Sequence, residues 1–422
     1  ELNQFLRGAT ETTFLPECTT EEVCRLLRPT RYVITLDADT IIPPGAARRL
    51  IGTLAHPLNR AVFDDQDRVV SGYTVLQPRM EVHPGSVGLS WFTRIYTGGR
   101  GLDLYTHAVS DVYQDLFGEG IFVGKGIYDV DAFARSVHNR IPENALLSHD
   151  LLEGSLGRAG LVTDVTMVED YPPSYFATTR RQHRWIRGDW QLLPWLLRPA
   201  RFNCHLSPID RWKVVHNLLR SLISPAMIVV LVATAGMRGF GWVWLLAILM
   251  AYGVPLATSM PVGLARAIRG QAWKFDWGTL GRQAARLALA VSFLPYDTYV
   301  ACQAILITLQ RLLITHRDLL TWTTAQQAAP DAQQQRQRNL RVMLAAAVLA
   351  TLLVVAGGLL ALPGEASPLR LLWVAPLALL WLGGPALVQV LDRPLVERIE
   401  SPTETELAQL RRLGRHTWNY FL

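Results

Sequence analysis

The sequence predicts an α/β domain followed by an α-helical transmembrane domain. Residues 1–200 carry charges throughout and contain short β-branched runs that end in acidic or glycine-rich loops, a pattern typical of α/β folds. From about Asn217 onward, long apolar runs are separated by short basic stretches, as in membrane proteins. Hydrophobic residues make up 50% of the 422 residues and charged residues only 18%, so the chain can build both a soluble core and membrane helices.

These changes in composition divide the chain into five segments. A soluble domain occupies residues 1–200, and a juxtamembrane helix with a first transmembrane hairpin occupies 201–262. Interfacial amphipathic helices and a cytoplasmic linker follow over 263–340, then a second transmembrane hairpin over 341–392 and a cytoplasmic tail over 393–422. The chain begins with a polar segment and not with Met, and its last residues look like the opening of a helix, so we expect a piece of a longer polypeptide.

Four apolar segments are long enough to cross a hydrocarbon core, which takes about 20 apolar residues. Short turns join them in pairs, so each pair is predicted to be a helical hairpin. Hydropathy does not separate a plain anchor from a channel for a polymer. The four segments are Leu218–Met237, Gly241–Pro261, Met343–Leu362 and Leu371–Leu391.

The basic residues set the expected orientation. They flank the outer ends of both hairpins, whereas each turn holds a single one, Arg238 or Arg370. Cytoplasmic loops carry the excess of Lys and Arg, so the soluble domain, the linker and the C-terminus are predicted to be cytoplasmic. The net charge of +6 arises from these clusters and not from a basic stripe interleaved with aromatics, so we expect membrane lipids and no nucleic acid as partners.

A fifth apolar stretch, Leu287–Leu309, has basic residues on both flanks and Pro295 near its middle. A single span would place one basic flank outside, so an interfacial or re-entrant segment is favoured over a true span. The preceding Pro261–Arg286 mixes arginine with aromatic residues, as an amphipathic helix on a membrane surface does.

The soluble half contains a predicted buried strand, Arg31–Leu36, followed by the carboxylates Asp37 and Asp39. Ligands of open α/β sheets bind at the carboxyl ends of strands, where a carboxylate or two and substrate phosphates can hold a hard divalent cation. A helix over Ala46–Leu54 and a strand over Val69–Pro78 are expected next. Because a lone D-x-D motif occurs by chance in many chains, a solvated loop with two acids is the alternative.

Two further loops hold candidate site residues. Phe117–Gly126 has four glycines and Lys125, which lets the backbone approach a ligand closely, but it lacks the spacing of a P-loop. A simple turn between strands is the alternative. Further on, Asp150 and Glu153 lie three residues apart and share one face if a helix begins there. For Asp150 the alternative is an N-cap.

The last motif, Thr178–Trp190, packs four arginines and two tryptophans into a short stretch. Arginine binds diphosphate through paired hydrogen bonds, and tryptophan offers a flat face on which a sugar can stack. The alternative is a basic juxtamembrane helix that meets anionic lipid.

Together, and in this order ahead of transmembrane hairpins, these features resemble the processive family-2 glycosyltransferases of cellulose synthase type. The signature of that family is an Asp, a D-x-D motif, an acid–Asp pair and [Q/R]-x-x-R-W. The last three match Asp37 with Asp39, Asp150, and Arg181-x-x-Arg184-Trp185. Arg181 stands where cellulose synthases carry Gln.

The match narrows to the transferase region of the cyclic β-1,2-glucan synthases, glycosyltransferase family 84, and covers nearly the whole chain. It lies in Thr35–Thr40, Gly118–Asp131, Ser148–Gly154 and Leu320–Ala325. The resemblance implies a GT-A-like (Rossmann-like) glycosyltransferase domain that is N-terminally truncated, because the strand whose acid should hold uracil is absent. It also implies further domains in the same polypeptide, glycoamylase-like and phosphorylase-like.

The resemblance further implies an inverting glucosyltransferase that polymerises glucose from UDP-glucose onto a growing glucan acceptor. The expected place is the cytoplasmic face of a bacterial inner membrane. Asp150 would be the catalytic base, and Asp39 with Asp37 would hold Mg²⁺ or Mn²⁺ on the diphosphate. Diphosphate contacts are expected from Arg181, Arg184 and Lys125, and acceptor contacts from Trp185, His149 and Glu153.

Other functions stay open from the sequence. The chain could make another β-glycan, such as cellulose or hyaluronan, or be a membrane scaffold or transporter that binds a nucleotide sugar without turnover. The intact set of acids and arginines argues against a degenerate site. The four cysteines, Cys18, Cys24, Cys204 and Cys302, lack metal-site spacing and are too few for a disulfide scaffold in a chain of this size, so free thiols are expected.

Overall fold

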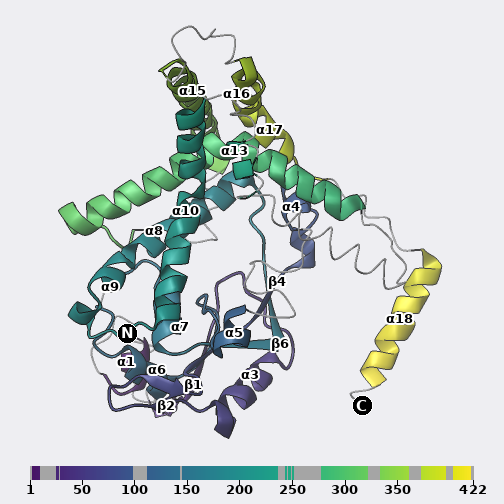
Figure 1. The fold of residues 1–422 in the computed structure, drawn as a ribbon. Coiled ribbons are helices and arrows are strands. Elements are labelled where there is room, and N and C mark those ends of the chain that lie inside the picture. The colour runs from purple at the N-terminus through teal and green to yellow at the C-terminus, as the bar shows by residue number, and fades with distance from the viewer. Residues whose placement is uncertain are drawn as a thin grey trace, which may run out of the picture.

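The computed structural model shows an α/β part and a group of long apolar helices that stand on it (Figure 1). The mixed α/β class is therefore confirmed. The structure describes residues 2–9, 25–27, 29–97, 112–142, 145–235, 243–244, 246–248, 250, 277–321, 333–360, 372–395 and 403–419.

The α/β part is built on a small mixed sheet with the strand order β1-β5-β4-β6. Its strands are β1 (Tyr32–Thr35), β5 (Gly126–Asp129), β4 (Val75–Val82) and β6 (Gly160–Glu169). Strand β5 pairs antiparallel with both β1 and β4, and β4 pairs parallel with β6. Strands β2 (Val62–Phe63) and β3 (Val69–Ser71) form a separate two-stranded sheet.

The strand directions bring the ends of β1, β4 and β6 and the start of β5 to the same end of the sheet. Thr35, at the end of β1, faces Gly126, at the start of β5, and the parallel strands β4 and β6 end side by side at Val82 and Glu169. The residues that follow β1, precede β5 and end β6 therefore meet at this end of the sheet. An isolated bridge between Ile41 and Val168 fastens the loop after β1 against β6.

Two predicted strands differ from the observed ones. The stretch Arg31–Leu36 is not a buried strand, because β1 lies at the sheet edge and its four residues are only half-buried. The stretch Val69–Pro78 is two strands, β3 and β4. Gly72, whose φ is +68°, turns the backbone between them, and a side chain there would collide with the carbonyl of Arg60.

Helices α3 and α6 pack on this sheet, whereas α4 and α8 lie toward the apolar helices (Figure 1). Helix α3 confirms the predicted helix, and its Leu50 and Leu54 pack on the sheet in an apolar core with Leu76 and Met167. Helix α8 covers the whole arginine- and tryptophan-rich motif. The helices are α1 (Leu2–Leu6), α3 (Ala46–Ala55), α4 (Trp91–Tyr96), α5 (Val112–Phe117), α6 (Val130–Val137), α7 (Asp150–Leu156), α8 (Tyr175–Gln191) and α9 (Leu193–Leu197).

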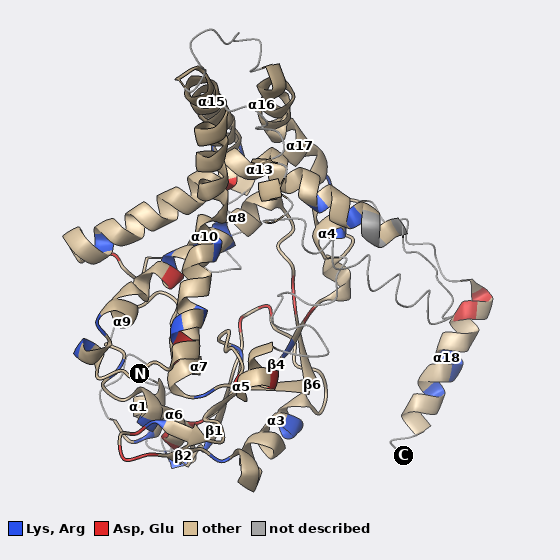
Figure 2. Ribbon diagram, viewed as in Figure 1, with Lys and Arg blue, Asp and Glu red and all other residues tan. Residues whose placement is uncertain are grey.

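Three described helices are long and apolar enough to cross a membrane: α10 (Pro208–Thr234), α13 (Trp277–Gln310, continued by a π-helix to Thr315) and α15 (Arg336–Leu360). Helices α16 (Val374–Leu382) and α17 (Gly384–Leu391) form a fourth candidate span with a 45° bend. Figure 2 shows α15 and α16 without charge along most of their length. The predicted segment Gly241–Pro261 and both hairpin turns lie largely outside the described residues.

The fifth apolar stretch is one continuous helix, α13, and is not broken at Pro295. Figure 1 shows α13 lying across the direction of α15 and α16, between these helices and the α/β part. It shares an apolar core with α10, α15 and α16, in which Leu294 packs near Leu231, Val354 and Trp381. The crosswise position is what an interfacial helix would adopt, although α13 is long enough to span, so its placement at the membrane surface stays a prediction.

Helix α13 also ties the apolar helices to α8. Phe293 and Tyr296 of α13 pack on Tyr175 and Phe176 of α8, and the Tyr175 hydroxyl donates a hydrogen bond to Asp297 at 2.6 Å. The helix that carries the arginine motif is thus held between the sheet and the apolar helices. The last described helix, α18 (Glu404–Asn419), is exposed.

Of the four cysteines, Cys204 and Cys302 are free thiols, whereas Cys18 and Cys24 lie outside the described residues.

Candidate active site

A pocket of about 500 Å³ opens at the sheet edge where the strand ends meet. Its walls come from the glycine-rich loop before β5, the start of α7, the middle of α8 and the first half of α10. Most of the predicted site residues line it: Asp37, Lys125, His149, Asp150, Arg181, Arg184 and Trp185. Asp39 and Glu153 are not among the described residues that line it.

One end of the pocket is a chain of ion pairs that joins β1, β5, β6 and α8. The Lys125 ammonium lies 3.0 Å from Oδ2 of Asp37 and donates a short hydrogen bond to Glu169. The other carboxylate oxygen of Glu169 accepts a hydrogen bond from Arg181 at 2.9 Å. Lys125 and Glu169 are buried whereas the Asp37 side chain is 50% exposed, so Asp37 is the member that faces an incoming ligand.

Asp37 and Asp39 both follow β1, and of the two only Asp37 is among the described residues that line the pocket. Burial, and then the nearby carboxylates Glu169 and Asp37, raise the pKa of Asp39, while Lys125 opposes the rise. Such crowding of negative charge is relieved by a cation. Among the described residues no group of three or more His, Cys, Asp or Glu could hold a metal ion by itself. A Mg²⁺ or Mn²⁺ ion held by Asp37 and Asp39 and completed by phosphate oxygens, which is the usual mode for Mg²⁺, stays a prediction.

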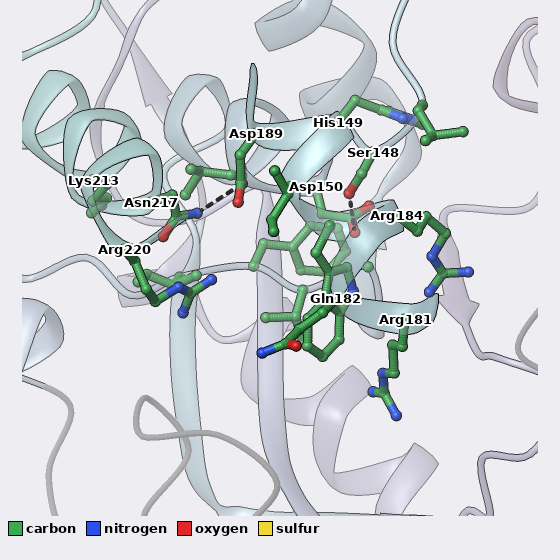
Figure 3. A pocket seen from close by; sticks show the side chains of 18 of the residues that line it. Ser148, His149, Asp150, Arg181, Gln182, Arg184, Asp189, Lys213, Asn217 and Arg220 are labelled. Carbon is green, nitrogen blue, oxygen red and sulfur yellow. Dashed lines mark hydrogen bonds between the residues drawn. The ribbon is translucent and has the colours of Figure 1, made fainter. Parts of the chain in front are cut away.

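Asp150 lies at the first position of α7, deep in the pocket between the cationic end and α10 (Figure 3). Its carboxylate accepts a 3.4 Å hydrogen bond from the Ser148 hydroxyl and caps no backbone amide. Burial, followed by the charge of Glu153, raises the pKa of Asp150. The N-cap alternative therefore does not hold, and a carboxylate with a raised pKa suits a general base.

The glycine-rich loop makes room for this carboxylate. Gly124 has a φ of +86°, and a Cβ there would lie 3.0 Å from the carboxylate atoms of Asp150. Only glycine adopts this backbone conformation without strain. On the other side, Gly188 of α8 lets Ser148 approach closely, because a Cβ at that position would lie 2.7 Å from Cβ of Ser148.

Two arginines of α8 line the end of the pocket that holds the ion-pair chain. Figure 3 shows Arg181 and Arg184 extending to the same side of α8. Burial lowers the pKa of the Arg184 guanidinium, while the charges of Asp37, Asp150 and Asp39 oppose that change, so Arg184 lies within electrostatic reach of all three acids. The Arg181 guanidinium stacks 4.7 Å from the centre of the Trp185 ring. One face of Trp185 is therefore occupied, and a sugar could stack only on the other.

His149 and Glu153 pair with each other across the first turn of α7. Nε2 of His149 lies 3.2 Å from Oε1 of Glu153, and this hydrogen bond raises the pKa of His149 to about 9. His149 is thus positively charged at neutral pH. It lines the pocket, whereas Glu153 orients it from behind, so direct acceptor contacts of Glu153 stay a prediction.

The opposite wall of the pocket was not anticipated from the sequence. Asp189 of α8 accepts a hydrogen bond from the Asn217 amide of α10 at 3.0 Å, and Arg220 also lines this wall (Figure 3). Burial raises the pKa of Asp189 to about 6, although Arg220 and Asn217 oppose it. A carboxylate, an amide and a guanidinium can together donate to and accept from sugar hydroxyls.

Glu169 was also missed, although a usable signal existed. It follows the strand-like run Gly160–Val168, as Asp37 follows β1, and the same rule about strand ends applies to it. Asn217 and Arg220 carried a weaker signal, since they are polar residues at the start of an apolar run.

Comparison with known proteins identifies a relative of the whole chain. The cyclic β-(1,2)-glucan synthase NdvB of Rhizobium meliloti (strain 1021) is 36% identical over 439 aligned residues, which cover 100% of this chain. The chain is a homologue of this glucan synthase. The resemblance to the cyclic β-1,2-glucan synthases is thereby confirmed. The chain spans 15% of the length of NdvB, so the related polypeptide holds other domains. No protein-family model matches the chain.

Proposed function

We propose that this chain is the glucosyl-transfer core of a cyclic β-1,2-glucan synthase, with a GT-A-like domain at the cytoplasmic face of a bacterial inner membrane. Its donor would be UDP-glucose and its acceptor the growing glucan. The observation that carries the proposal is the position of Asp150, a half-buried carboxylate that lines one pocket between the end with Lys125 and the arginines and the wall of Asp189, Asn217 and Arg220. The similarity to NdvB supports this choice of product.

In the proposed reaction, Arg184, Arg181 and Lys125 bind the diphosphate of the donor. Fixed positive charge in a partly buried site stabilises the leaving group more than it would in water. Asp37 and Asp39 would hold Mg²⁺ or Mn²⁺ on the same diphosphate, and the bound ion would offset the charge that develops as UDP leaves.

The acceptor sugar would lie between Trp185 and the wall of Asp189, Asn217 and Arg220. Its hydroxyl oxygen attacks the anomeric carbon of glucose from the face opposite the diphosphate. As the new C–O bond forms, the bond to the diphosphate oxygen breaks, and the hydroxyl proton passes to the Asp150 carboxylate. A single displacement of this kind inverts the anomeric configuration, so an α-linked donor gives a β-linked product.

The product made by the complete polypeptide tests this proposal. Membranes that contain it are incubated with radiolabelled UDP-glucose, and the linkages of the labelled polymer are determined by methylation analysis. We expect β-1,2 linkages. Labelled polymer with another linkage would show that the chain makes a different glycan, and binding of UDP-glucose without incorporation would indicate a scaffold.

A further inference from the structure

Glu169, the last residue of β6, is a buried carboxylate at the centre of the ion-pair chain. Its side chain is 2% exposed, and its two oxygens bind two cations, Oε1 the Arg181 guanidinium and Oε2 the Lys125 ammonium. The cations come from separate elements, the loop before β5 and helix α8. Burying a charge is costly unless it is paired and hydrogen-bonded, and Glu169 is paired on both oxygens.

We propose that Glu169 is a positioning residue whose carboxylate holds Lys125 and Arg181 at the end of the pocket where a nucleoside diphosphate binds. This inference rests on the proposed function, from which it takes the diphosphate site. Glu169 would not touch the reacting atoms, because its side chain is 2% exposed and both of its oxygens are already paired with Lys125 and Arg181.

The physical reason is preorganisation. Lysine and arginine side chains have many rotamers, and fixing each one when a ligand binds lowers affinity. Because Glu169 binds Lys125 and Arg181, the rotamers of these two side chains are already fixed before the ligand arrives. Lys125 is moreover shared between Glu169 and Asp37. If Glu169 lost its charge, Lys125 would keep Asp37 as its carboxylate partner and would no longer be held from the buried side of the pocket.

A purely structural role is the competing explanation, since Glu169 also links β6 to α8 through Arg181. Such a role predicts lower thermal stability with unchanged ligand affinity in the molecules that remain folded. The positioning role predicts weaker diphosphate binding in folded protein. Ligand affinity therefore separates the two explanations.

The test uses the complete polypeptide purified in detergent, with UDP as the probe. Dissociation constants are measured by calorimetry with and without Mg²⁺, and the KM and kcat of glucose transfer are measured separately. In Glu169→Gln we expect UDP affinity to fall about 10-fold or more, because two rotamer-rich side chains lose their fixed positions. KM should rise by more than kcat falls, and Glu169→Asp, which keeps the charge, should restore part of the affinity.

The control is Glu81→Gln on β4. Glu81 also pairs with an arginine, Arg79, but does not line the pocket. It should leave UDP affinity and KM unchanged. Folding of each variant is checked by thermal melting. Wild-type UDP affinity in folded Glu169→Gln would overturn the proposal.

If Glu169→Gln does not fold, the pair Lys125→Met and Lys125→Met/Glu169→Gln replaces it, because the double variant leaves no unpaired Lys125. The positioning role then predicts weaker UDP binding in the double variant, because the introduced glutamine can accept a hydrogen bond from Arg181 but no longer forms an ion pair with it. Equal affinity in the two variants would contradict it. Absence of glucose transfer in the wild type, with UDP still bound, would reject the proposed reaction and leave the role of Glu169 measurable.

Discussion

Asp150 is the side chain on which the proposed chemistry depends most directly. Asp150→Asn keeps the shape of the residue but cannot accept a proton, so we expect glucose transfer to fall by about 10²–10⁴-fold, the usual contribution of a general base. UDP affinity should change little. The rate is measured with the complete enzyme, and Asp164→Asn, an exposed acid on β6, is the control. Near-normal transfer by Asp150→Asn would reject the assignment of the base.

Gly124 tests whether the glycine-rich loop positions that carboxylate. Gly124→Ala forces a side chain into a left-handed backbone conformation, at a cost of about 1–2 kcal/mol, and places Cβ 3.0 Å from the Asp150 carboxylate. Gly45→Ala is a matched control, because φ is +79° there but nothing lies within 4 Å of the added Cβ.

Both variants should lose similar thermal stability, and only Gly124→Ala should slow glucose transfer, by about 10-fold or more, since small displacements of a catalytic group are costly. Melting temperatures and transfer rates are measured in parallel. Equal rates in the two variants would mean that the contact with Asp150 has no role in the reaction.

At the scale of elements, the first turn of α7 carries a pH-sensitive pair. Glu153 raises the pKa of His149 to about 9 in the folded protein, above its ordinary value of 6.5. The pair therefore contributes fully to stability below pH 6.5, and the contribution is lost as the pH rises through about 9. Because the His149 side chain is 46% exposed, solvent screening keeps the effect small.

Thermal melting of wild type and His149→Gln between pH 6 and pH 10 measures this contribution. We expect the difference in melting temperature to be largest near pH 6 and to vanish above pH 9. A difference that does not change with pH would show that His149 is not charged in the folded state.

Helix α8 is tied to its surroundings by Gln191, which is 1% exposed. Its amide oxygen accepts a hydrogen bond from the backbone N–H of Leu147 at 2.6 Å, and its amide nitrogen donates one to the Leu319 carbonyl at 3.0 Å. One side chain thus joins the segment before Asp150 to the segment after α13.

Gln191→Leu should lower the free energy of unfolding by about 1–3 kcal/mol. It removes the partner of the Leu147 backbone N–H and one of the two hydrogen bonds to the Leu319 carbonyl, which also accepts one from Arg187 at 3.4 Å. Gln191→Glu keeps the acceptor for Leu147 but buries a carboxylate beside the Leu319 carbonyl, so its loss should be at least as large. Melting temperatures in detergent measure both. Equal stability of Gln191→Leu and wild type would show that these bonds contribute nothing.

At the scale of the whole molecule, the placement of α13 decides the topology. If α13 lies on the membrane surface, the turn of the second hairpin lies on the side of the membrane opposite the cytoplasm. If α13 spans the membrane, that turn lies on the cytoplasmic side. Ser367→Cys, in a background without the four native cysteines, reports on this turn.

We expect a membrane-impermeant maleimide to label Ser367→Cys in intact spheroplasts and to label Gln334→Cys only after permeabilisation. The reverse pattern would establish that α13 crosses the membrane. Crosswise packing of α13 on α10 and α15 favours the first outcome.

The sequence by itself determined the class of the chain, its apolar helices and most of the candidate site. Strand ends, glycine-rich loops and arginine motifs are local patterns, and they placed seven of the nine predicted site residues in one pocket. The homology to NdvB agrees with the resemblance carried by the same motifs.

Only the tertiary structure decided which side chains pair. Glu169 meets Lys125 and Arg181 because β6, the loop before β5 and α8 converge at one sheet edge, and that convergence depends on strand order. The wall of Asp189, Asn217 and Arg220 likewise exists because α8 packs on the start of an apolar helix. Local sequence patterns do not specify which distant elements pack together, so these contacts could not be predicted from the motifs alone.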